Sequence, residues 1–193
     1  MPAQGYTAER RATDLREFLA PLSNVLLIGW SLGAIESLQY VYMFGADKLA
    51  GMILVDSSVG EEPAPSGEGT FLKSLRENRA ANLESFVRAI FSTPQPESEI
   101  QNLLRGAQRM ELENSIALLS YPFVRTHWKE IAHAFKKPLL YIVTPQFEEQ
   151  ARNLQKNRPG TQIEIFKDAG HALFVDEPER FNATVRAFAA KLK

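Results

Sequence analysis

The sequence predicts an α/β fold built on a parallel sheet of about four strands with helices around it. Strands are expected over three short apolar runs and one mixed segment, at 24–28, 52–55, 139–143 and 162–166. Apolar residues at helical spacing precede, separate or follow these runs at 8–19, 34–42, 148–154 and 181–192. Strands that alternate with amphipathic helices are typical of a parallel sheet, whose strands all end at one edge.

The alternation stops between residues 57 and 135. Three or four helical patterns follow a loop rich in glycine and proline, with breaks at 92–96 and at 121–122. We therefore expect a core formed by residues 1–56 and 136–193, and a helical cap or lid formed by residues 57–135.

Composition excludes several classes of protein. The formal net charge is −1, from 22 basic and 23 acidic residues that are interleaved, so neither nucleic acid nor an anionic membrane is an expected partner. The absence of cysteine excludes disulfides, thiolate metal sites and a cysteine nucleophile. No apolar stretch approaches the roughly 18 residues of a membrane span, and we expect a soluble cytoplasmic protein. Neither a metal-ligand cluster nor a phosphate loop is evident, so no cofactor is expected.

One motif carries chemistry directly. Gly29-Trp30-Ser31-Leu32-Gly33 follows the first strand and opens a helix, which is the context of a G-x-S-x-G nucleophile elbow. The turn presents the Ser31 oxygen at the carboxyl end of the sheet. We expect Gly29 and Gly33 to be required because side chains there would collide with the neighbouring strand and helix. The Leu32 N–H is the expected oxyanion donor.

A serine nucleophile needs a base, because an alcohol is a weak nucleophile at neutral pH. His171 lies in the loop after the last predicted strand, at the edge of the sheet where sites assemble. His127 and His133 lie in the helical segment beside aromatic residues, and a structural role is expected for both. His171 is therefore the predicted general acid–base.

On the elbow, the Gly170-His171 loop and the helical segment between them, the chain resembles the α/β-hydrolase superfamily over essentially its whole length. The resemblance implies a Ser-His-Asp/Glu triad and a helical cap over an acyl pocket. Serine at the elbow argues against the haloalkane dehalogenase and epoxide hydrolase branches, which carry aspartate there. The elbow also resembles that of pimeloyl-acyl-carrier-protein methyl ester esterases, whereas the position of the acid argues against that group.

The acid departs from the usual pattern of the superfamily. In most relatives it follows the strand after the cap, but residues 144–147 contain no carboxylate. Asp56 matches an alternative position used by some branches and is preferred, although it could instead cap a turn. Glu148 and Glu149 resemble first-turn helix residues, and Asp168 resembles a turn residue.

The resemblance also implies about four strands before the elbow, and a loop among them that supplies a second oxyanion donor. Here the chain starts at the helix before the nucleophile strand, so we expect an amino-terminally shortened form. The strand at 24–28 would then form an open edge. Such an edge predicts aggregation, complementation by a missing segment, or a homo-oligomer paired through strands.

The sequence favours a serine hydrolase that cleaves a carboxylic ester, with an apolar acyl group, through an acyl-enzyme. Ser31 is the expected nucleophile, His171 the base and Asp56 the orienting acid. Cofactor-free haloperoxidases and C–C bond hydrolases keep similar triads and stay alternatives within the fold. A non-catalytic or truncated protein that acts by binding a partner is the alternative outside it.

Overall fold

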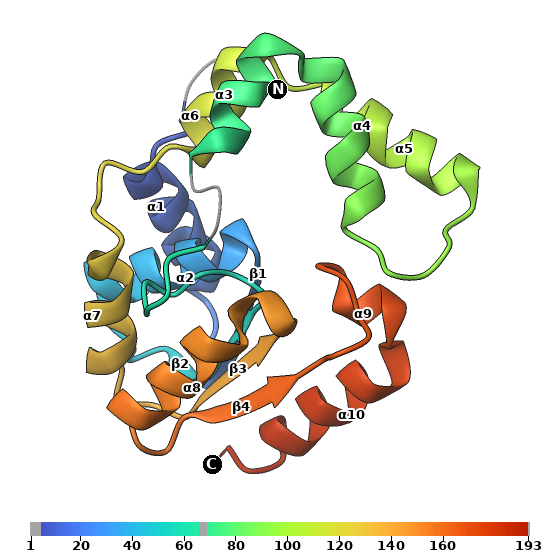
Figure 1. The fold of residues 1–193 in the computed structure, drawn as a ribbon. Coiled ribbons are helices and arrows are strands. Elements are labelled where there is room, and N and C mark those ends of the chain that lie inside the picture. The colour runs from blue at the N-terminus through green and yellow to red at the C-terminus, as the bar shows by residue number, and fades with distance from the viewer. Residues whose placement is uncertain (1–4, 66–68, 193) are drawn as a thin grey trace.

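The computed structural model describes residues 5–65 and 69–192. Its centre is a parallel sheet in which the spatial order of the strands equals their order in the chain, β1-β2-β3-β4 (Figure 1). The predicted α/β class and the predicted pairing of sequential strands are confirmed. The strands are β1 Val25–Trp30, β2 Leu49–Val55, β3 Leu139–Val143 and β4 Gln162–Ile165.

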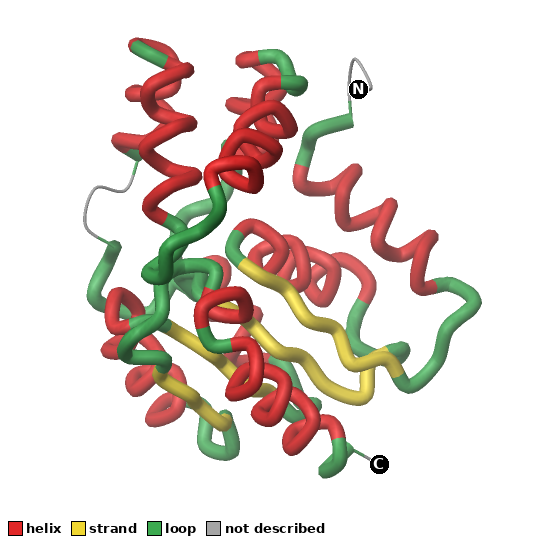
Figure 2. Tube along the Cα trace, turned by 90° about the vertical axis from the view of Figure 1, so that its right-hand side faces the viewer, coloured by secondary structure: helices red, strands yellow, loops and turns green. Residues whose placement is uncertain are grey.

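Helices cover both faces of the sheet (Figure 2). One face packs against α1, α2, α7 and α8, and the other packs against α9 and α10. The bounds of these helices are α1 Ala8–Leu19, α2 Leu32–Phe44, α7 Thr126–Ala134, α8 Glu148–Asn157, α9 Leu173–Asp176 and α10 Pro178–Ala189.

The apolar runs of β2 and β3 are explained by this double cover. Met52 and Leu54 belong to the core under α2, whereas Ile53 and Val55 belong to the core under α10. Successive side chains of a strand point to opposite faces, so a strand covered on both faces must be apolar at every position. These two strands fix the carboxyl edge of the sheet as the rigid support of the site.

The segment between β2 and β3 is helical, as predicted. Among the described residues it contains five helices rather than three or four. Asn78 divides the first pattern in two, because its side chain accepts a hydrogen bond from Ala81 N at 3.2 Å and caps a new helix, and α7 is a further helix after the predicted patterns. Their bounds are α3 Thr70–Glu77, α4 Arg79–Ala89, α5 Glu97–Gln108, α6 Leu112–Leu119 and α7. We refer to residues 57–135 as the insert.

The insert has two parts with different contacts. Trp128, Ile131 and Ala132 of α7 lie in the main core, where α7 packs on α2. The α3–α6 helices stand beyond the carboxyl edge of the sheet, with α3 and α6 above α1 and with α4 and α5 above α9 (Figure 1).

Strand β1 is at the edge of the sheet in the described part of the chain, as expected. The N–H groups of Val25 and Ser31 donate toward β2, to Lys48 O and Val55 O, each at 2.9 Å. The backbone groups of Leu26, Ile28 and Trp30 alternate with these along the strand and therefore point away from β2. The side chain of Ile28 is 43% exposed.

Candidate active site

The elbow has the strained geometry that the motif predicts. Ser31 lies between β1 and α2 with φ 54° and ψ −121°, a positive φ that non-glycine residues rarely adopt. Its N–H donates to Val55 O of the neighbouring strand at 2.9 Å. Such strain persists only where the surroundings fix the backbone, and it holds the serine at the edge of the sheet.

The two glycines of the elbow differ. A Cβ at Gly29 would lie 2.3 Å from Gly33 O and 2.6 Å from Ser37 Oγ, so Gly29 is required, as predicted. At Gly33 no atom of the described residues outside its own helix lies within 4 Å of such a Cβ. The expectation that Gly33 also avoids a collision is wrong, because its Cβ direction leads into open space.

The structure brings His171 and Asp56 together. Asp56 directly follows β2, is 1% exposed and accepts a hydrogen bond on Oδ2 from His171 Nδ1 at 2.7 Å. The histidine side chain is 22% exposed. Because Nδ1 faces the carboxylate, Nε2 is the ring nitrogen left to exchange a proton with a nucleophile.

Trp30 connects this pair to the elbow. Its Nε1–H donates to the carbonyl oxygen of His171 at 2.8 Å, and the two rings lie with their centroids 5.1 Å apart. Because Trp30 directly precedes Ser31, this hydrogen bond joins the loop of His171 to the elbow. The predicted nucleophile, base and acid are thus gathered at one edge of the sheet.

Thr144 is a site residue that the sequence did not reveal. It follows β3, is buried, and donates to Asp56 Oδ1 from its N–H at 2.7 Å and from its Oγ1 at 2.8 Å. The two oxygens of Asp56 therefore have separate partners, Thr144 on Oδ1 and His171 on Oδ2. These hydrogen bonds satisfy both oxygens of a buried polar group, which would be costly to bury without partners.

Tyr141 fixes the chain just beyond the acid. Its hydroxyl donates to Ser57 O at 2.6 Å. Burial raises the pKa of Tyr141 well above its ordinary value, and the charges of Asp56 and Glu61 add to this effect. The phenol therefore stays protonated and keeps its donor role.

The other candidate acids lie elsewhere. Glu148 accepts from Arg152 on the surface of α8, at 2.6 Å from Nη2, and Glu149 is exposed in the first turn of the same helix. Asp168 is exposed, and its carbonyl oxygen accepts from Ser92 Oγ at 2.7 Å. None of the contacts described for these three residues involves the ring of His171.

The two histidines of the insert have structural contacts, as expected. His127 stacks on Phe123 with centroids 4.3 Å apart, and burial lowers its pKa. His133 Nε2 contacts the buried carboxylate of Glu61.

Leu32, the predicted oxyanion donor, is the first residue of α2. The first N–H groups of a helix have no acceptor within the helix, and the helix dipole places partial positive charge there. This position suits the stabilisation of a negative oxygen next to Ser31.

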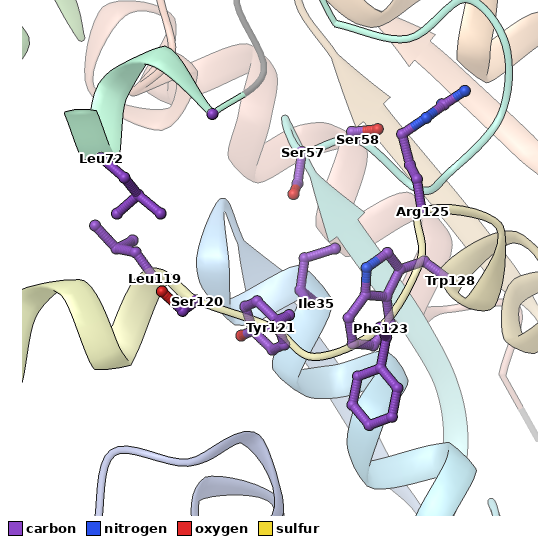
Figure 3. A pocket seen from close by; sticks show the side chains of 11 residues that line it. Ile35, Ser57, Ser58, Leu72, Leu119, Ser120, Tyr121, Phe123, Arg125 and Trp128 are labelled. Carbon is purple, nitrogen blue, oxygen red and sulfur yellow. The ribbon is translucent and has the colours of Figure 1, made fainter. Parts of the chain in front are cut away.

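A cavity of about 410 Å³ lies between α2, the segment after β2 and the insert (Figure 3), and Ser31, Asp56 and His171 are not among the residues that line it. It is bounded by Ile35, one turn of α2 after Ser31, and by Ser57, which follows Asp56. The insert supplies most of the remaining wall, with apolar side chains of Leu72, Leu119, Phe123 and Trp128.

The described residues contain neither a candidate metal site nor a helix that could span a membrane. No group of three or more histidine, cysteine and acidic side chains there could hold a metal ion. In the same part of the chain, no helix has both the length and the apolar character needed to cross a bilayer.

Residues 1–184 match the sequence profile of the Alpha/beta hydrolase family. The chain belongs to this family. A pimeloyl-[acyl-carrier protein] methyl ester esterase of Vibrio vulnificus is 25% identical, with 99% of this chain and 82% of the relative aligned. The similarity to known hydrolases therefore covers nearly the whole chain and not the elbow alone.

Solved structures show the same fold. The esterase EaEST from Exiguobacterium antarcticum superposes with a TM-score of 0.82 at 22% identity, covering 98% of this hydrolase and 76% of that chain. A bromoperoxidase from Bacillus anthracis superposes with a TM-score of 0.81 at 20% identity, and the superposition covers 99% of this hydrolase and 77% of the bromoperoxidase chain.

The elbow predicts opposite outcomes for its two glycines. Gly29→Ala should unfold or severely destabilise the protein, because the new methyl group meets backbone and Ser37. Gly33→Ala should keep or raise stability, by roughly 0.5–1 kcal/mol, since alanine is favoured over glycine within a helix. Thermal and urea unfolding of both variants measure this, and equal destabilisation would contradict the stated geometry.

Removing the Thr144 hydroxyl should also be measurable. Thr144→Val keeps the shape of the side chain but takes one donor from the buried Asp56 carboxylate, so unfolding free energy should fall by roughly 1.5–3 kcal/mol. Thr144→Ser keeps the donor and serves as the matched control. Urea denaturation at neutral pH compares them, and equal losses in both variants would assign the effect to packing instead.

Proposed function

We propose that this hydrolase cleaves carboxylic ester bonds through an acyl-enzyme. The observation that carries the proposal is the 2.7 Å bond between His171 and the buried Asp56, held against the strained Ser31 elbow through Trp30. The names of the relatives, a methyl ester esterase and the esterase EaEST, support ester hydrolysis.

We assign a role to each residue of the site. His171 Nε2 takes the proton of Ser31 Oγ as this oxygen attacks the ester carbonyl carbon, and the Leu32 N–H stabilises the tetrahedral oxyanion. His171 then gives the proton to the leaving alkoxide, which departs as an alcohol. A water molecule attacks the acyl-serine by the same route, and its proton passes through His171 back to Ser31.

Asp56 and Thr144 act on the base rather than on the substrate. Asp56 holds the His171 tautomer that has its proton on Nδ1 and stabilises the imidazolium that forms in each step. The two hydrogen bonds from Thr144 fix the orientation of the Asp56 carboxylate.

The cavity bounded by Ile35 and Ser57 supports an apolar acyl group as the bound part of the substrate. Its wall combines Ile35 with side chains of the insert, among them Leu72 and Leu119. Burial of apolar chain there would supply roughly 25 cal/mol per Å² removed from water. In this proposal, residues 57–135 act as the cap over the acyl group.

The exposed edge of β1 supports a second copy as a partner. An edge strand with free backbone groups pairs readily with another strand, and β1 contains no charged residue or proline to prevent it. Antiparallel pairing about Ile28 would place β1 of one chain against β1 of the other, as a two-fold axis requires.

Turnover should depend on the triad residues. Wild-type protein should hydrolyse p-nitrophenyl butyrate and be labelled by a fluorophosphonate, and Ser31→Ala should lose both. Asp56→Asn should lower kcat by roughly 10⁴ without unfolding the chain, because the histidine tautomer is no longer fixed.

Glu148→Gln is the matched control for the acid, since its partner is Arg152. A Glu148→Gln variant without turnover, beside an active Asp56→Asn variant, would contradict the assignment of the acid. A folded wild-type protein that the fluorophosphonate does not label would contradict the proposal that Ser31 is the nucleophile of an esterase.

Self-association should depend on the edge. Ile28→Lys places a charge on β1 and should shift the chain toward the monomer in size-exclusion chromatography with light scattering. Val124→Lys is the control, because Val124 is 74% exposed and lies in the insert. A wild type that is monomeric at every concentration would contradict pairing through β1.

A further inference from the structure

Hydrogen bonds to the carboxylate of Asp176 join the loop that carries His171 to the insert. Asp176, at the end of α9, accepts from Gly170 N at 2.8 Å and from Ser92 N at 3.0 Å, both on Oδ2. Its Oδ1 accepts from Thr93 N at 3.0 Å and also from Thr93 Oγ1. We call these four residues the Asp176 clamp. It joins the residue before the base to the connection between α4 and α5.

Backbone contacts reinforce the clamp on both sides of His171. The Ala172 N–H donates to Ile90 O at 2.7 Å, immediately after the base. A Cβ at Gly170, immediately before it, would lie 2.8 Å from both Ile90 O and Ser92 N. The glycine of the Gly170-His171 loop is therefore required by the approach of the insert.

Helix α4 also reaches the base itself. The Phe86 ring lies edge-on to the His171 ring with centroids 6.5 Å apart, and it packs against Phe71 of α3 at 5.2 Å. The α4–α5 pair stands directly above α9 (Figure 1). A shift of α4 away from the sheet would thus disturb the ring contact and the clamp together.

Asp176 is held as an anion by neutral donors. Burial alone would raise its pKa, but the hydrogen bonds from Ser92, Thr93 and Gly170 outweigh burial and lower the pKa below its ordinary value. Hydrogen bonds to a charged acceptor are about twice as strong as those between neutral groups. The hydrogen bonds described for Asp176 all come from residues of the clamp.

We propose that Asp176 is a positioning residue that docks the α4–α5 part of the insert onto the loop of His171, so that the base is aligned only while this part is docked. The inference rests on the proposed function, which makes His171 the base. The insert wall of the cavity comes from other segments, with Leu72, Leu119 and Trp128. The clamp should therefore act on turnover rather than on substrate binding.

The first test is Asp176→Asn, with Glu179→Gln as the control because Glu179 is exposed in the first turn of α10. With p-nitrophenyl butyrate, kcat of Asp176→Asn should fall roughly tenfold or more, as small misplacements of a catalytic group do. KM should stay within about twofold. Rates are divided by the fraction of Ser31 that a fluorophosphonate labels, which removes any loss of folded protein.

Hydrogen exchange supplies a readout that does not depend on turnover. In Asp176→Asn, amide exchange should accelerate together at 92–93 and at 170–172, with β2 and β3 unchanged. A structural loss alone would accelerate exchange throughout the core.

Thr93→Val tests the clamp from the side of the insert and needs no change near the base. It should lower kcat by a few-fold, and the double variant with Asp176→Asn should lose less than the product of the two single effects. Multiplicative effects, or an Asp176→Asn variant with wild-type kcat and exchange, would overturn the clamp while leaving the proposed function intact. A wild type without Ser31-dependent turnover would overturn both.

Discussion

The buried carboxylate of Asp56 is the constraint on which the site depends. A carboxyl group that is 1% exposed is costly to bury unless its oxygens find hydrogen-bond partners, and here Thr144 and His171 supply three from two other segments of the chain. The ends of β2 and β3 and the loop after β4 must therefore meet at one point. Ser31 is tied to the same point, because its N–H donates a hydrogen bond to the carbonyl oxygen of Val55, the residue just before Asp56.

Much of this arrangement could be predicted from the sequence. The apolar runs gave the strands because burial on both faces leaves no freedom in residue type, and Gly29-Trp30-Ser31-Leu32-Gly33 marked the elbow because a tight turn restricts side chains. The choice of Asp56 over Glu148 agrees with the geometry, since the carboxyl ends of neighbouring parallel strands lie side by side.

The sequence could not reveal the side-chain contacts that depend on how distant segments are oriented toward each other. Thr144 was visible only as a residue that is not an acid, because a hydroxyl gives no sign of which carboxylate it faces. Asp176 and Thr93 are far apart in the chain, and no periodicity relates them. The expectation for Gly33 was wrong for a similar reason, because spacing does not tell where a Cβ points.

In the proposed triad, the nucleophile and the acid lie close together in the sequence, whereas the base lies far from both. Ser31 and Asp56 belong to a single β1-α2-β2 unit, whose contacts are local in sequence, whereas His171 arrives from the last fifth of the protein. Units with local contacts form early and distant pairings close late, since loop closure costs entropy. In the proposed mechanism, a chain still emerging or partly unfolded at its carboxyl end would lack the base for Ser31 until the last loop docks.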